Sequence, residues 1–262
     1  MHFHFMGGDR RQSLLARYIE ERGFRTGCSF PGGMPQWEAD YLILPLPTTK
    51  DGRTLHAPRS EQTIPLAEIF AQFRGRRIFG GMLPPDAPPD AIDYYAAEEV
   101  LLANANATAE GALALAIERT PFILAGSPAL ILGGGRIGQF LAAKLAALGA
   151  KVTVAARRSE TIALCRAFGW DGRLYEDVPY KNFRLVFNTV PATVLDEQRL
   201  ATLPEGAILI ELASAPGGFD PAQALAHRLK VCSAPGLPGK YSPESAAAFI
   251  GQYILKEMEA HG

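Results

Sequence analysis

The sequence predicts an α/β protein with two domains, each a parallel β-sheet with helices on its faces. Short apolar runs alternate with helical patterns in both halves of the chain, a rhythm typical of βαβ units. The length of 262 residues suits two domains of ordinary size. An alanine-rich stretch at 98–120 separates the two regions and favours a helix. We therefore expect a cleft between the domains, a connector helix that joins them and a C-terminal helix.

The first domain is expected to span residues 1–102. HFHFM at 2–6 is an apolar strand that runs into Gly7-Gly8, and the apolar residues of 9–22 recur at helical spacing. YLILPLP at 41–47 predicts a buried strand that prolines stop. The pattern then predicts a helix at 66–73, a strand at 76–81 and a loop at 82–90.

The second domain is expected to span 103–241 and to include the connector helix, 104–119. Its expected elements are a strand at 129–132 with the helix after it, a strand before 157, a helix at 159–168, and strands at 184–191, 207–214 and 229–236. A last helix at 242–260 is expected to pack back on the first domain. Ser242 is its expected N-cap, and Pro243 suits its first turn.

Composition narrows the class of protein. An apolar fraction of 48% supports folded cores, and a net charge of −1 gives no electrostatic reason to expect nucleic acid or an anionic membrane as a partner. We find no signal-peptide pattern and no apolar run of about 18 residues, so no transmembrane helix is expected. Cys28, Cys165 and Cys232 form neither a disulfide framework nor a zinc pattern. We therefore expect a cytoplasmic protein without a metal site.

The strongest motif follows the strand ALIL, where Gly133-x-Gly135-x-x-Gly138 opens a helix. In this context the first glycine permits a tight turn, the second lets a pyrophosphate approach the backbone, and the third lets helix and strand pack closely. The helix N-terminus would add unpaired N–H groups for the phosphates. The alternative is a glycine-rich connection without a ligand. The motif predicts Rossmann-like domains and dinucleotide contacts at Gly133, Gly134, Gly135, Arg136, Ile137 and Gly138.

The end of the next strand indicates which dinucleotide binds. Many such domains carry an acidic residue there, which accepts a hydrogen bond from the ribose 2′-OH of NAD. This chain has Arg157, Arg158 and Ser159, and no carboxylate before Glu160. Guanidinium groups suit a 2′-phosphate, so NADP is the expected cofactor. NAD is the alternative if the arginines only solvate the start of the following helix.

Two further turns are expected at the carboxyl edge of the same sheet, where such folds bind ligands. The first is Asn188, Thr189, Val190 and Pro191, with the Thr189 hydroxyl expected near the nicotinamide ribose. The second includes Ala213 and Ser214, where nearby glycines permit a close backbone approach. Ordinary turn chemistry is the alternative for both segments.

Further stretches match one protein family along nearly the whole chain. They are GGDRRQ (7–12), ILPLPTT (43–49), ATAEGALALAIERT (107–120), GGGRIG (133–138), AARRS (155–159), FNTVPA (187–192), ELASAPGGFD (211–220) and APGLPGKYSPESA (234–246). With these motifs the sequence resembles the A subunits of dipicolinate synthase from endospore-forming bacteria. The glycine motif is generic, whereas the ASAPGG and APGLPG blocks together are much more specific.

The resemblance implies an activity, a partner and a location. It implies that a dihydrodipicolinate-level intermediate of the diaminopimelate/lysine pathway is oxidised to dipicolinate (pyridine-2,6-dicarboxylate) during sporulation. The family's A subunit works with a B subunit that looks like a flavoprotein, and we expect homo-oligomers as well. Its fold resembles that of 2-hydroxyacid dehydrogenases. The resemblance places the protein in the mother-cell cytoplasm and leaves open which of the two chains carries the chemistry.

A planar dicarboxylate substrate would require cations or backbone donors. Arg10, at the start of the first helix, can supply both. Lys240 and Tyr241 follow APGLPG and are expected to face the cleft from the second domain. The alternative for Arg10 is a solvated helical turn.

Other candidates for substrate binding or proton transfer lie in the remaining motifs. Thr48, beside Thr49, and Thr108, on the connector helix, offer hydroxyl groups. Glu110 is either a general base or a cap of the helix start. His56 and His227 have no visible acidic partner, and formation of an aromatic product needs little acid–base help.

Two other functions compete with this interpretation. FNTVP resembles the end of a strand in shikimate-dehydrogenase-like reductases, although the first domain lacks the Lys and Asp set of that family. A nucleotide-binding scaffold subunit without catalytic activity is the other alternative. Ultraviolet absorbance of the pyridine dicarboxylate product would distinguish the three.

Overall fold

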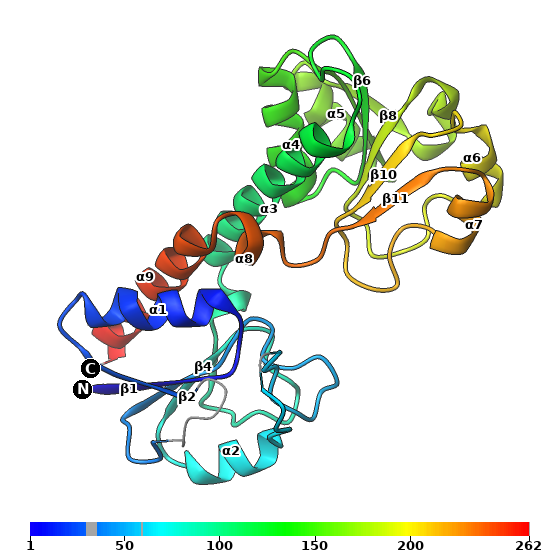
Figure 1. The fold of residues 1–262 in the computed structure, drawn as a ribbon. Coiled ribbons are helices and arrows are strands. Elements are labelled where there is room, and N and C mark those ends of the chain that lie inside the picture. Colours follow the sequence, from blue (N-terminus) through cyan, green and yellow to red (C-terminus); the bar gives the residue numbers. More distant parts are fainter. Residues whose placement is uncertain (30–35, 59, 262) are drawn as a thin grey trace. The chain divides into compact units, whose positions relative to one another are not determined.

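A computed structural model describes residues 1–29, 36–58 and 60–261 and confirms an α/β protein with two parallel sheets (Figure 1). Contacts divide the chain into two compact units, Met1–Asn104 with Pro238–Gly262, and Ala105–Leu237. The segment 238–241, which we expected in the second domain, falls in the first unit.

The first unit contains a five-stranded parallel sheet with the order β2-β1-β3-β4-β5. The strands are β1 (His2–Met6), β2 (Arg25–Ser29), β3 (Tyr41–Ile43), β4 (Arg77–Gly80) and β5 (Ile92–Asp93). The helices between them are α1 (Arg10–Glu20) and α2 (Leu66–Gln72), and the 3₁₀ helix η1 (Tyr94–Ala96) follows β5. The strand expected at 41–47 ends at Ile43, because Pro45 and Pro47 have no N–H group for the ladder. The strand order reverses between β1 and β3, as in flavodoxin-like sheets.

The short helix α8 (Leu237–Tyr241) leads into the C-terminal helix α9 (Pro243–His261), which packs on α1 in the first unit. The fully buried Ile254 of α9 lies in one core cluster with Phe3 and Leu15. A Cβ at Gly251 would overlap the ring of Tyr18, so glycine permits the close approach of the two helices. Ser242 stands at the expected N-cap position, since its carbonyl oxygen accepts from the Ala246 N–H at 2.9 Å, but its buried hydroxyl forms no hydrogen bond with a described residue.

The second unit contains a six-stranded parallel sheet with the order β11-β10-β9-β6-β7-β8. The strands are β6 (Pro128–Leu132), β7 (Lys151–Ala156), β8 (Asp171–Leu174), β9 (Leu185–Asn188), β10 (Ile208–Glu211) and β11 (Lys230–Ser233). The helices are α4 (Arg136–Ala147), α5 (Ser159–Ala167), α6 (Glu197–Thr202) and α7 (Pro221–Ala226), with 3₁₀ turns η2 (Tyr175–Asp177) and η3 (Tyr180–Asn182). Helix α3 (Glu98–Arg119) starts in the first unit and belongs to the second from Ala105 onward. Numbered from β6, this is the Rossmann order 3-2-1-4-5-6. The strand order reverses between β6 and β9.

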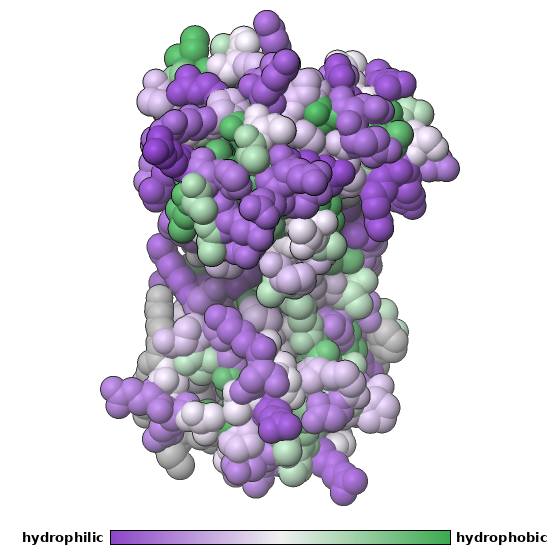
Figure 2. All heavy atoms as spheres, turned by 90° about the vertical axis from the view of Figure 1, so that its right-hand side faces the viewer, coloured by the Kyte–Doolittle hydropathy of each residue, from purple (hydrophilic) through white to green (hydrophobic). Residues whose placement is uncertain are grey.

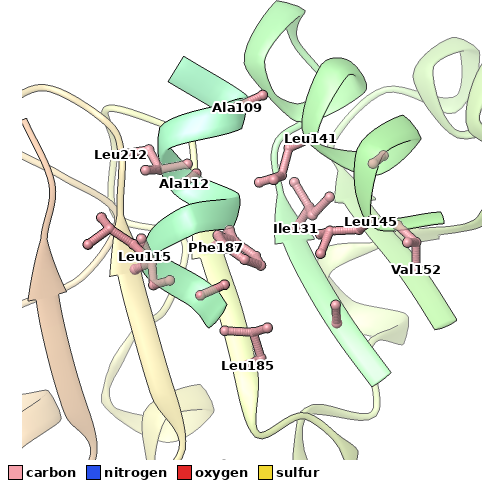
Figure 3. Packing of buried hydrophobic residues seen from close by; sticks show 14 of the residues in the cluster. Ala109, Ala112, Leu115, Ile131, Leu141, Leu145, Val152, Leu185, Phe187 and Leu212 are labelled. Carbon is pink, nitrogen blue, oxygen red and sulfur yellow. The ribbon is translucent and has the colours of Figure 1, made fainter. Parts of the chain in front are cut away.

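Alternating residues of the strands supply two cores, one on each face of this sheet. On one face, Ala112 of α3 and Leu141 of α4 pack with Ile131 of β6 and Phe187 of β9 (Figure 3). On the other face, Leu130 and Leu132 of β6 pack in a separate buried cluster with alternate residues of the adjacent strands. Burial on both faces explains why the central strands β6, β9 and β10 are almost continuously apolar, whereas the edge strands β8 and β11 are not.

Helix α3 is the one helix of the described residues that is long and apolar enough to cross a membrane. Its most apolar window has a mean hydropathy of 1.4, although polar residues such as Asn104, Asn106 and Glu110 interrupt its apolar sequence. However, 56% of that window is buried inside the protein, and the core helix of a soluble protein passes the same test. Figure 2 shows hydrophilic and hydrophobic residues intermingled on the face drawn.

Ile254→Ala should lower the free energy of unfolding by about 2–5 kcal/mol, because it leaves a cavity in the buried contact between α9 and α1. Urea unfolding of the full chain measures this change. Gln252→Ala, on the exposed side of the same helix, is the control and should change stability by less than about 0.5 kcal/mol. Equal stability of the two variants would contradict the assignment of α9 to the core of the first unit.

Candidate functional site

The glycine turn between β6 and α4 leaves open space at the N-terminus of the helix. Gly133 has a φ of +102°, a left-handed conformation that favours glycine. Gly135 is the N-cap of α4 and forms no side-chain cap, and a Cβ on it would meet nothing within 4 Å. The first N–H groups of α4 therefore have no capping side chain and face a space that suits an anionic ligand.

Tight packing behind the turn holds it in place. A Cβ at Gly138 would overlap the carbonyl oxygen of Gly133, so only glycine lets α4 approach β6 this closely. Gln139, which sequence analysis missed, donates from Nε2 to the Gly134 carbonyl oxygen at 2.9 Å. Of the other residues predicted here, Arg136 is exposed and Ile137 is half-buried.

The strand order reverses beside this turn and brings the segment 188–191 next to it. The backbone N–H and the hydroxyl of Thr189 both donate to the Leu132 carbonyl oxygen at 2.9 Å. A Cβ at Gly133 would meet the Thr189 hydroxyl and Val190. Parallel α/β sheets bind ligands at this position, outside the carboxyl ends of the strands.

Arg157, Arg158 and Ser159 follow β7 and are exposed. Neither arginine forms an ion pair or a side-chain hydrogen bond with another residue that the structure describes. A Cβ at Gly134 would overlap the methyl group of Thr161, so the first turn of α5 lies against the glycine turn. Two unpaired guanidinium groups thus stand on segments that adjoin the candidate phosphate site.

Glu211 ends β10 and was missed by sequence analysis. Its carboxylate accepts hydrogen bonds from Asn188 Nδ2, from the Ala213 N–H and from the Gly218 N–H, at 2.7, 2.9 and 2.8 Å. Asn188 is buried, whereas Ser214 is exposed. An acidic residue directly after the buried strand segment ILI is the signal that could have found this position.

In the first unit, the structure brings the segments of Arg10 and Lys240 together. Arg10 is the exposed first residue of α1. A Cβ at Gly239 would lie 2.9 Å from Asp9 Oδ2 and 2.8 Å from Arg11 Nε, so the segment before Lys240 packs on the start of α1. Lys240 is exposed, and its Nζ lies 5.1 Å from the ring centroid of Tyr241.

Arg11 and Asp9, which sequence analysis did not select, hold this corner of the first unit. Asp9 caps α1 by accepting from the Arg11 N–H at 2.9 Å and also receives Arg11 Nη2 at 2.8 Å. Arg11 Nη2 donates to the Leu46 carbonyl oxygen as well, which links the carboxyl ends of β1 and β3. Burial alone would raise the pKa of the Asp9 carboxyl, but the hydrogen bonds and charge of Arg11 outweigh it and keep the pKa below its usual value.

The remaining candidates have local partners or are buried. Thr48 is fully buried, and its hydroxyl donates to the Pro45 carbonyl oxygen at 3.1 Å. Thr108 is buried on α3. Glu110 is exposed and pairs with Lys144 at 3.0 Å. Since α3 begins at Glu98, Glu110 does not cap a helix start, which corrects that alternative.

A metal centre has no support in the part of the chain that the structure describes. Residues 1–29, 36–58 and 60–261 contain no group of three or more His, Cys, Asp or Glu side chains that could hold an ion.

Comparisons with known proteins agree with this architecture. No family model matches the chain. The A subunit of dipicolinate synthase from Bacillus subtilis (strain 168) is 28% identical over an alignment of 279 positions, gaps included, which covers 96% of this chain and 93% of that protein. A crystal structure of the corresponding A subunit from Bacillus halodurans has a TM-score of 0.87 at 26% identity and covers 98% of this chain and 97% of that chain.

A more distant solved structure shares the fold alone. It is an L-alanine dehydrogenase with a TM-score of 0.66 at 14% identity, and the match covers 100% of this chain and 91% of that chain. The sequence and structure comparisons together confirm, over nearly the whole chain, the resemblance to the A subunits of dipicolinate synthase that the sequence motifs indicate.

Proposed function

We propose that this protein is an NADP-dependent oxidoreductase subunit that takes part in the synthesis of pyridine-2,6-dicarboxylate. Similarity to the A subunits of dipicolinate synthase and a dehydrogenase-type fold support an oxidoreductase-type subunit. The observation that carries the proposal is the open glycine turn at the strand-order reversal, with two unpaired arginines on the segment after β7. NADP fits this arrangement better than NAD because a 2′-phosphate can accept bidentate hydrogen bonds from guanidinium.

The substrate of the proposed reaction is a dihydrodipicolinate-level dianion. A nicotinamide bound in the second unit would accept the hydride, while a neighbouring C–H or N–H group of the substrate loses a proton. Arg10 and Lys240 are the proposed partners of the two carboxylates, because both are exposed and their segments pack together. Thr48, Thr108, Glu110 and Tyr241 remain proposed contacts, although the hydroxyl of Thr48 already has an intramolecular partner.

We propose further that the chain works in the cytoplasm with a flavoprotein-like B subunit. The relatives are named as one lettered component of dipicolinate synthase, which supports the existence of a partner. Reconstitution of both components with the lysine-pathway intermediate and each cofactor tests the function directly. Formation of the pyridine product supports it, whereas cofactor binding without turnover in any combination favours the scaffold alternative.

Replacing Arg157 and Arg158 together by Ala should narrow the preference for NADP(H) over NAD(H) by about tenfold or more. A hydrogen bond to a charged group contributes about 1.5–3 kcal/mol, and about 1.4 kcal/mol is a factor of ten. Calorimetry with both cofactors measures the preference. Lys151→Ala, at the opposite end of β7, is the control. Equal affinities of the unmodified protein for both cofactors would contradict the proposed role of the arginines.

Gly135→Val should abolish dinucleotide binding and leave the fold intact. A Cβ at this position meets no protein atom within 4 Å, so the added side chain would enter the space proposed for the pyrophosphate. Circular dichroism checks the fold, and titration with NADPH measures binding. A folded variant with normal affinity would place the dinucleotide elsewhere.

Arg10→Ala and Lys240→Ala should each lower kcat/KM of the reconstituted enzyme by about thirtyfold, because loss of one carboxylate contact costs about 2 kcal/mol. Steady-state kinetics with both components measures the effect. Arg17→Ala, an exposed arginine further along α1, is the matched control. Unchanged kinetics in both variants would remove these cations from the substrate site, and full activity of this chain alone would remove the need for the partner.

A further inference from the structure

We propose that Glu211 is a positioning residue that holds the nicotinamide side of the dinucleotide site in shape. This inference rests on the proposed function, since it assigns a role within the same site. Glu211 lies at the carboxyl end of β10, the same edge of the sheet as the glycine turn after β6. Its carboxylate joins two segments that follow β9 and β10, at 188–190 and 213–218.

The three groups that Glu211 binds are all hydrogen-bond donors. Oε1 accepts from Asn188 Nδ2 and from the Ala213 N–H, and Oε2 accepts from the Gly218 N–H. An ionised carboxylate is an acceptor at both oxygens, so it satisfies all three donors at once. A glutamine cannot do so, because its NH₂ group must face at least one of them.

Asn188 cannot turn its amide to compensate. Its Oδ1 accepts from the Val190 N–H at 3.1 Å, and its Nδ2 donates to the Val190 carbonyl oxygen at 2.9 Å. A flipped amide would place NH₂ against N–H and oxygen against oxygen at Val190. The backbone of Val190 therefore sets the orientation of Asn188, and the Nδ2 group faces Glu211 in consequence.

Gly218 extends the contact to a third segment. Its carbonyl oxygen accepts from the N–H groups of Val194 and Leu195 at 2.8 and 2.9 Å. A Cβ at Gly218 would overlap the amide of Asn188, so the two residues are in direct contact. Loss of the carboxylate would release the Gly218 N–H and loosen the packing of 188–190, 194–195 and 213–218 together.

The strand order indicates which half of the dinucleotide meets these segments. A Rossmann sheet consists of two mononucleotide-binding halves that meet where the order reverses. The arginines proposed for the 2′-phosphate follow β7, in one half, whereas β9 and β10 belong to the other. Under the proposed function, the segments that Glu211 holds therefore adjoin the nicotinamide half, and Glu211 acts through them rather than by touching the reacting atoms.

The test compares NADPH with 2′-phospho-ADP-ribose, which has no nicotinamide. Glu211→Gln should weaken NADPH binding by about tenfold or more and leave 2′-phospho-ADP-ribose within about twofold, as measured by calorimetry. Glu205→Gln is the matched control, since Glu205 is exposed and pairs with Arg228 on the surface of the same unit. This variant should bind both probes like the unmodified protein.

Each other outcome overturns the inference in a recognisable way. Unchanged NADPH binding by Glu211→Gln removes the positioning role, and equal losses for both probes indicate a general defect of the unit. An unmodified protein that binds neither probe overturns the proposed function itself, and the inference with it. Amide hydrogen exchange of the cofactor-free protein gives an independent readout. The Ala213 and Gly218 amides should exchange faster in Glu211→Gln, and unchanged protection of both amides would refute the proposed hydrogen bonds to the Glu211 carboxylate.

Discussion

The close approach of helix α4 to strand β6 is the contact on which the second unit depends. A methyl group at Gly138 would overlap the Gly133 carbonyl oxygen, so any larger residue would push the helix away from the sheet. At this distance Leu141 and Leu145 reach the core beside Ile131 (Figure 3). The same approach aims the uncapped first turn of α4 at the open space beside Gly135. Packing of the core and exposure of phosphate-binding donors thus follow from one steric constraint.

At the carboxyl edge of the six-stranded sheet, the charged groups on the two sides of this turn differ in their hydrogen bonding. After β7 stand two arginines with no ion-pair partner among the described residues, whereas after β10 a carboxylate is fully engaged by three donors. Unpaired guanidinium groups are suited to meet an anion from outside the protein. A carboxylate that already accepts hydrogen bonds from three protein donors is suited to hold together the loops that carry those donors. The proposed placement of the 2′-phosphate of NADP on the β7 side rests on this contrast.

In the first unit, a charged side chain near the strand-order reversal pairs within the protein. The guanidinium of Arg11 donates hydrogen bonds to the Asp9 carboxylate and to the Leu46 carbonyl oxygen, and these contacts join the carboxyl ends of β1 and β3. This internal pairing leaves the adjacent Arg10 exposed at the start of α1, and the contact at Gly239 brings the segment of Lys240 to the same corner. The exposed Arg10 beside the segment of Lys240 is the basis for the proposed contacts of these two cations with a small dianion.

Local patterns in the sequence determined the fold class, the glycine turn and the cationic end of β7, because each depends on residues close together in the chain. Short edge strands such as β2 and β5 escaped prediction, since pairing with neighbours rather than apolar periodicity defines them. Only the tertiary structure decided that Arg11 is an internal partner and Arg10 the exposed one, that the Ser242 hydroxyl forms no hydrogen bond with a described residue, and that Glu211 binds Asn188. Those outcomes depend on hydrogen-bond donors and acceptors that lie far apart in sequence, and only the packed sheets bring these groups within bonding distance.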